Sequence, residues 1–165
     1  MKYSAMLYKS MLDLADEYAD KNSGCMKVSV GSVIMFNITR DPLITGMFGA
    51  NRTLPISCKE NGCQRVQLYG ENSKLHRNPE DCRAIHSEVD AICNAAREGY
   101  STLGATIFVT RYPCEACARA IVSAGISKVV YGREQECSEQ TKEIFKNAGV
   151  SLIHVEDWDA PDVTY

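Results

Sequence analysis

Residues 105–131 read ATIFVTRYPCEACARAIVSAGISKVVY, and this stretch decides the fold. It predicts a strand over residues 105–110, a helix over 115–124 that ends at Gly125, and a second strand over 128–131. A strand, a helix and a further strand in this order form a parallel βαβ unit with a right-handed crossover. The fold class is therefore expected to be α/β.

The segments on both sides of this unit continue the alternation of helices and strands. Glycines follow two of the predicted helices, as they commonly do at helix C-termini, and an Asp-Pro pair predicts the turn of an early hairpin. The further expected elements are an amphipathic helix over 3–20, hairpin strands over 28–36 and 43–48, helices over 87–98 and 138–148, and a strand over 150–155.

The size and composition of the chain are those of one ordinary globular domain. It has 165 residues, of which 45% are apolar and 24% are charged, and these are average values. We expect a single domain over residues 1–165 with a long, polar and irregular insert at about 52–82.

The net charge of −3 narrows the class of partner. It argues against a dedicated binder of nucleic-acid strands, whose surface is usually basic, but it leaves room for a small anionic substrate. Residues 51–85 carry six basic and four acidic side chains, a local net charge of +2. This excess is either a solvated loop or a lip that receives phosphate.

The unusual feature of the composition is its eight cysteines. The first 20 residues mix charged with apolar side chains, unlike the unbroken apolar core of a signal peptide. No run approaches the roughly 18 apolar residues of a membrane-spanning helix. We therefore expect a cytoplasmic protein, or one of the host cytoplasm if its source is a virus. In that reducing setting cysteines are more often thiols or metal ligands than disulfides.

Two short motifs, each at the start of a predicted helix, carry the chemistry. The first is HSE at residues 86–88 and the second is PCEAC at residues 113–117. Cys114 and Cys117 share one face of a helix, near the end where the dipole favours thiolates. With His86 they make three ligands and leave a fourth position open, which is typical of a catalytic zinc.

Glu88 is the candidate proton carrier. It lies two residues along the predicted helix from His86, so we expect it about 200° around the axis, a poor position for a ligand to the same ion. Each motif alone is weak, because His-x-Glu occurs by chance and Cys-x-x-Cys also occurs as a redox pair. Their combination in consecutive βα units predicts zinc-assisted hydrolysis.

With these motifs the sequence resembles the zinc-dependent cytidine deaminase superfamily, and within it most closely the deoxycytidylate (dCMP) deaminases of the phage type. The resemblance covers about residues 26–155 and includes VSVGSVI at 28–34, GANRTLP at 49–55 and HSEVDAI at 86–92. It implies a three-layer fold with a central five-stranded mixed sheet flanked by helices. It also implies a zinc-dependent hydrolase that deaminates dCMP to dUMP and ammonia, which supplies dUMP for thymidylate synthesis.

The resemblance further implies roles for single residues. Glu88 takes a proton from the activated water and delivers it to ring nitrogen N3, and the water attacks C4. Asn51 matches an asparagine that holds the sugar and the base edge, although the residue alone favours a turn. Arg52 and Tyr112 depart from the family's small residues at their positions and are expected near the substrate, Arg52 toward a phosphate or an effector. Asp90 stands where many relatives have Asn.

These departures keep other readings open. The substrate could be a modified cytosine nucleotide, such as 5-methyl-dCMP or 5-hydroxymethyl-dCMP, or a cytosine nucleoside. A non-catalytic zinc-stabilised binding module is a further alternative, against which Glu88 argues because a structural zinc needs no proton carrier. The resemblance alone implies an allosteric homo-oligomer, often a hexamer, with dCTP and dTTP as effectors that require Mg²⁺.

The insert carries candidate ligands for a second, structural zinc. Three cysteines and a histidine lie in it at spacings like those of closed zinc sites, and the resemblance adds a cysteine after the first helix. A zinc cross-link would organise a loop with little core of its own, whereas the alternative is unrelated thiols. Of the other cysteines, Cys93 is expected in the core and Cys137 has no special role. The candidate ligands are Cys25, Cys58, Cys63, His76 and Cys82.

Overall fold

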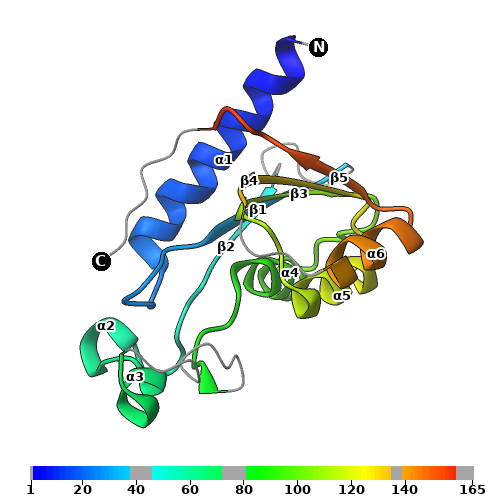
Figure 1. Ribbon diagram of the computed structural model, residues 1–165. Coiled ribbons are helices and arrows are strands. Elements are labelled where there is room, and N and C mark those ends of the chain that lie inside the picture. Colours follow the sequence, from blue (N-terminus) through cyan, green and yellow to red (C-terminus); the bar gives the residue numbers. More distant parts are fainter. Residues whose placement is uncertain (1, 38–45, 72–80, 135–138, 159–165) are drawn as a thin grey trace.

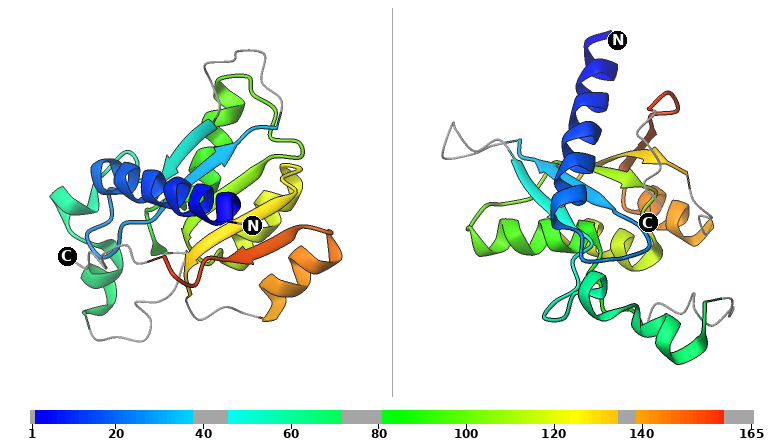
Figure 2. Two further views of the ribbon diagram at one scale, coloured as in Figure 1. Left: turned by 90° about the horizontal axis from the view of Figure 1, so that it is seen from above. Right: turned by 90° about the vertical axis from the view of Figure 1, so that its left-hand side faces the viewer.

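A computed structural model describes residues 2–37, 46–71, 81–134 and 139–158 (Figure 1). One mixed sheet of five strands lies at its centre. Helix α1 (Lys2–Asn22) packs on one face, and α4 (Ser87–Arg97), α5 (Glu115–Ser123) and α6 (Glu139–Asn147) lie on the other (Figures 1 and 2). The expected three-layer α/β architecture is therefore confirmed.

The sheet has the strand order β2-β1-β3-β4-β5. β1 pairs with β2 and β3 in antiparallel fashion, whereas β3, β4 and β5 run parallel to one another. This confirms both the hairpin and the parallel units expected from the alternation of elements. The strands are β1 (Gly31–Met35), β2 (Gly46–Ala50), β3 (Thr106–Arg111), β4 (Lys128–Arg133) and β5 (Ser151–His154).

β1 begins three residues later than expected for a physical reason. The Val30 N–H donates to the Asn51 side-chain oxygen over 2.9 Å, and the Asn51 amide donates to the Val28 carbonyl over 2.8 Å. A side chain thus takes the place that a neighbouring strand would fill. Residues 43–45 of the predicted second strand lie outside the described residues.

The two sides of the sheet have separate cores. Ile107 and Val109 of β3 belong to the cluster under α4, α5 and α6, whereas Phe108 belongs to the cluster under α1, as the period of two in a strand requires. α4 ends before Gly99, which has a φ of 75°, as predicted. Among the described residues no helix combines the length and apolar character needed to cross a membrane.

The insert contains more regular structure than its sequence indicated. Two short helices, α2 (Cys58–Asn61) and α3 (Gln64–Tyr69), lie away from the sheet (Figure 1). Ser57 caps α2, because its side chain accepts a hydrogen bond from the Lys59 N–H over 3.2 Å. The insert then returns to the body, where Thr53 bridges to Ala84 just before α4.

Candidate active site

The predicted metal ligands converge at the N-termini of α4 and α5. His86 and Cys114 are the N-cap residues of these helices, with extended backbones and no side-chain cap hydrogen bond. The His86 Nδ1 lies 3.4 Å from the Cys114 Sγ and 3.3 Å from the Cys117 Sγ. Of the residues that the structure describes, these three form the one group of His, Cys, Asp or Glu whose ligand atoms all lie within 4.8 Å of one another. We call them the cap cluster.

The three side chains of the cap cluster shift one another's pKa values. Hydrogen bonds with Cys117, which has the larger effect, and with His86 lower the pKa of the Cys114 thiol to about 4, although partial burial opposes this shift. The same bond with Cys114, together with burial, raises the pKa of Cys117. The hydrogen bond with Cys114 also raises the pKa of His86. These shifts favour the thiolate form of Cys114, the form in which a cysteine binds a metal ion.

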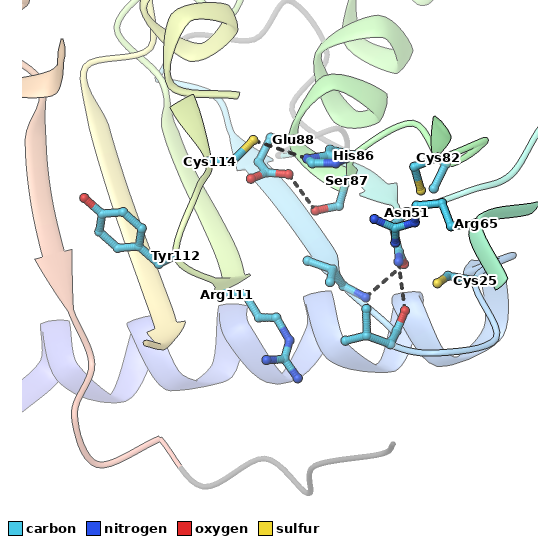
Figure 3. Close-up of a pocket in the computed structure, with 13 residues that line it drawn as sticks. Cys25, Asn51, Arg65, Cys82, His86, Ser87, Glu88, Arg111, Tyr112 and Cys114 are labelled. Atoms are coloured by element: carbon cyan, nitrogen blue, oxygen red, sulfur yellow. Dashed lines mark hydrogen bonds between the residues drawn. The ribbon is translucent and has the colours of Figure 1, made fainter. Parts of the chain in front are cut away.

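Glu88 lies beside the cap cluster and is 4% exposed. Burial raises the pKa of its carboxyl group. The Ser87 hydroxyl, itself 2.6 Å from the Ser32 hydroxyl, donates to the Glu88 Oε2 over 3.2 Å (Figure 3). Sequence reasoning did not single out either serine.

Glu88 lies outside the group of close ligand atoms, although the helical rotation used to expect this does not apply. His86 precedes the helix as its N-cap, so the rotation of 100° per helical residue does not relate it to Glu88. The Glu88 carboxyl lies close to Cys114 (Figure 3) and hydrogen bonds with Cys117. A carboxyl group at this position can exchange protons with a molecule bound at the cluster.

A pocket of about 660 Å³ opens beside these residues. Its lining includes His86, Glu88 and Cys114, together with Arg65 of α3 and Arg111 at the end of β3 (Figure 3). Neither arginine was named from the sequence. The signal that pointed to Arg65 was the local excess of basic residues in the insert, whereas Arg111 gave no signal of its own.

Two of the predicted substrate residues, Asn51 and Tyr112, also line this pocket. Asn51 is 6% exposed, and its amide is held at both ends by the backbone of Val28 and Val30. The Tyr112 ring packs edge-on against Tyr131, with 4.9 Å between centroids, and Figure 3 shows its hydroxyl pointing away from Glu88. The substrate role of Tyr112 stays a prediction.

Arg52, the third predicted substrate residue, is not part of the pocket lining. Its guanidinium group donates to both carboxylate oxygens of Asp90, with the Nε at 3.1 Å and 2.9 Å, and to the Asn94 Oδ1 at 3.4 Å. Two departures from the family pattern, Arg52 and Asp90, are therefore each other's partner.

The insert cysteines gather on the other side of the pocket. Cys25, Cys58 and Cys63 are buried and Cys82 is partly buried, and Cys25 and Cys82 line the pocket (Figure 3). Burial, and then the charges of the other three thiols, raise the pKa of Cys58. The four are therefore neighbours, although less tightly grouped than the cap cluster. His76 and Cys137 lie outside the described residues.

The remaining cysteine corrects an expectation. Cys93 was predicted to pack in the core, but it is exposed. α4 buries Ala91, Asn94 and Ala95 instead, and the turn of the helix carries the residue between them to the solvent side.

Comparison with known proteins relates this arrangement to one family. The sequence model of the "cytidine and deoxycytidylate deaminase zinc-binding region" matches residues 6–133. A deoxycytidylate deaminase of Mycobacterium phage D29 is 45% identical over 119 residues, which are 70% of this chain and 87% of that protein. One from Saccharomyces cerevisiae is 34% identical over 134 residues, 81% of this chain and 40% of that protein.

A solved structure shares the fold. The dCMP deaminase of cyanophage S-TIM5, determined with dCMP and dUMP, matches with a TM-score of 0.64 and 20% identity over 90% of this chain and 96% of that chain. The present chain spans between 40% and 64% of the length of four of the curated relatives that it matches.

Proposed function

Because the chain belongs to the cytidine and deoxycytidylate deaminase zinc-binding family, we propose that it is a zinc-dependent hydrolase that converts dCMP and water to dUMP and ammonia. Such a reaction supplies dUMP for thymidylate synthesis. The observation that carries the proposal is the cap cluster, which meets the buried carboxyl group of Glu88 at the wall of one pocket. A purely structural metal site would have no use for that carboxyl group.

The donor set of the cap cluster fits zinc. Ligands at typical zinc–nitrogen and zinc–sulfur bond lengths in a tetrahedron lie about 3.5 Å apart, close to the 3.3 and 3.4 Å between the His86 nitrogen and the two sulfurs. Two sulfurs and one imidazole leave the fourth position to the pocket. A zinc ion bound there supplies Lewis-acid activation of a water molecule near neutral pH.

Glu88 is proposed to move the protons. Its buried carboxyl group has a raised pKa, which suits a group that must both accept and release a proton. It takes a proton from the attacking water, delivers it to ring nitrogen N3, and then assists the departure of the C4 amine as ammonia. The Ser87 hydroxyl, which donates to Glu88, holds the carboxyl group in place.

The substrate is proposed to be a nucleotide because the pocket wall is basic. Arg65 and Arg111 both line it, and a phosphate is the anion that guanidinium groups bind best. The Arg65 side chain hydrogen bonds with Cys63, whereas its buried Nε has no hydrogen-bond partner among the described residues. Asn51, which lines the same pocket, keeps one amide hydrogen and one lone pair for the sugar or the base edge.

Ammonia release from a panel of substrates tests the proposal. The panel contains dCMP, 5-methyl-dCMP, 5-hydroxymethyl-dCMP, deoxycytidine and single-stranded DNA, each offered to the zinc-loaded protein. We expect turnover of dCMP, and Glu88→Gln should lower it by about a hundredfold to ten-thousandfold. Glu98→Gln, at the exposed far end of α4, serves as the matched control.

The outcomes separate the alternatives. Faster turnover of a 5-substituted nucleotide would identify a modified cytosine as the substrate, and turnover of deoxycytidine alone would overturn the phosphate contacts. A zinc-loaded protein without turnover of any substrate would be a binding module. Equal rates for the Glu88→Gln variant and the wild type would remove Glu88 from the mechanism.

A second, structural zinc is proposed at the insert cysteines, Cys25, Cys58, Cys63 and Cys82, with His76 as a further candidate. The burial of the first three supports it, as does the raised pKa of Cys58, to which the other three thiols contribute. A backbone hydrogen bond also joins the segment of Cys25 to that of Cys58, since the Lys59 N–H donates to the Gly24 carbonyl over 3.2 Å. Metal analysis should then give about two zinc ions per chain.

The remaining proposals rest on the family alone. They are a cytoplasmic homo-oligomer, often a hexamer in this family, with dCTP and dTTP as effectors and Mg²⁺ as their counter-ion. A sedimentation experiment and a dCMP titration with and without each effector would test them.

A further inference from the structure

Asp90 is a buried carboxylate that holds two residues of a neighbouring segment. Its side chain is 3% exposed. The Ala50 N–H donates to its Oδ2 over 3.1 Å, and the Arg52 Nε lies 3.1 and 2.9 Å from its two oxygens. A second guanidinium nitrogen of Arg52 donates to Oδ1. Planar two-point contacts of this kind fix geometry as well as charge.

Further contacts extend the attachment by one helical turn. The Asn94 amide donates to the Phe48 carbonyl over 2.8 Å, and its oxygen accepts from Arg52 over 3.4 Å. Gly49 lies directly on α4, where a Cβ atom would come within 2.2 Å of the Ser87 carbonyl oxygen. The segment 48–52 is thus fastened to α4 at successive points.

These contacts surround Asn51. Its two neighbours in the chain, Ala50 and Arg52, are the two residues that Asp90 holds. Asp90 itself follows Glu88 by two residues, in the first turns of α4. Asn51 and Glu88 both line the pocket, so the Asp90 contacts set how far apart the two pocket residues lie.

We propose that Asp90 and Arg52 are a positioning pair that holds Asn51 in register with Glu88 for the reaction. The proposal rests on the deaminase function proposed above. It replaces the expectation that Arg52 binds a phosphate. The Nε and Nη2 atoms of Arg52 donate hydrogen bonds to Asp90, and Nη2 also donates to Asn94. The phosphate-binding role belongs to Arg65 and Arg111 of the pocket wall.

Two substrates that differ only in the phosphate distinguish these roles. Arg52→Gln is compared with wild type for kcat/KM on dCMP and on deoxycytidine. A positioning residue acts on both substrates, so we expect both values to fall by about tenfold to a hundredfold, with the ratio between them and the zinc content unchanged. A fall for dCMP alone would show that Arg52 contacts the phosphate and would overturn the proposal, as would unchanged kinetics.

Further variants guard against simple loss of folding. Arg52→Lys keeps the charge and should recover part of the loss. Arg52→Gln combined with Asp90→Asn should lose less than the product of the two single changes, because the pair is already broken. A combined loss equal to the product of the two single losses would contradict the pairing. Arg97→Gln, at the exposed end of the same helix, is the control.

Hydrogen exchange makes the pair testable even if no substrate is turned over. In Arg52→Gln and Asp90→Asn, backbone amides of residues 48–52 should exchange faster, whereas those of β3 should keep their rates. This measurement needs no turnover, so a wild type inactive on every substrate would overturn the proposed function and leave this test standing. Unchanged exchange in residues 48–52 would overturn the positioning pair.

Discussion

The cap cluster and the insert cysteines use the same ligand chemistry but are placed by different means. His86, Cys114 and Cys117 lie at the starts of α4 and α5, which pack against the central sheet. The His86 Nδ1 lies 3.4 Å and 3.3 Å from the sulfurs of Cys114 and Cys117. Of the insert cysteines, Cys25 follows α1, and Cys82 precedes α4. Cys58 begins α2 and Cys63 caps α3, two helices that lie away from the sheet (Figure 1). The four thiols are less tightly grouped than the cap cluster.

The difference shows what each group contributes. A core on both faces of the sheet supports the helices that carry the cap cluster, as a preorganised catalytic site requires. The insert has little core of its own, since α3 buries no residue. A metal bound at the insert cysteines would therefore stabilise the fold of the insert.

The largest expected effect is at the cap cluster. Cys117→Ala removes a buried ligand and should abolish zinc binding there, which lowers ammonia release by on the order of a thousandfold or more. The thermal midpoint should change less than the activity, because the sheet and its helices remain. Metal analysis and dCMP turnover measure both effects. Retention of half the activity would break the assignment of this cluster.

At the insert cysteines we expect the opposite order, with a larger effect on thermal stability than on activity. Cys58→Ser should remove about one zinc ion per chain and lower the thermal midpoint by roughly 5–10 °C, as a loss of a few kcal/mol does in a domain of this size. Turnover of dCMP should fall only a few-fold, since the cap cluster is intact. Zinc content equal to that of wild type would show that the insert cysteines are plain thiols.

The same contrast explains how far the sequence alone could go. From the motifs at residues 86–88 and 113–117 it could be predicted that His86, Cys114 and Cys117 lie close together, because helix starts in consecutive βα units lie at one edge of the sheet. The bounds of the later helices and strands followed from their periodicity and the glycines after them. Such information is local, and local patterns are what a sequence displays.

Contacts between distant segments were not visible in this way. Arg52 and Asp90 were each noticed as departures, but their pairing depends on how β2 lies on α4. The N-cap position of His86, which takes it out of the helical rotation that relates residues of α4, was not visible either. Arg111 ends β3 and lines the pocket, but no pattern in the sequence places it there. Each of these depends on tertiary packing rather than on the residue's neighbours in the chain.

A smaller effect is expected where the insert meets the catalytic pocket. Arg65→Gln should lower the preference for dCMP over deoxycytidine by about tenfold, the usual worth of one charge-assisted hydrogen bond. Its kcat/KM on deoxycytidine should stay close to wild type. Arg119→Gln, on the exposed face of α5, is the control. An unchanged preference would mean that the insert has no part in binding the phosphate.

The smallest effect should come from a cysteine that belongs to neither group. Cys93 is exposed on α4, in the same helix as Glu88, and no metal-ligating group of the described residues includes it. Cys93→Ser should leave zinc content and turnover unchanged and shift the free energy of unfolding by no more than about 0.5 kcal/mol. A denaturant titration and metal analysis decide this. Both groups of ligands were assigned on the premise that the position of a cysteine in the fold indicates whether it binds zinc. Loss of zinc in this variant would contradict that premise.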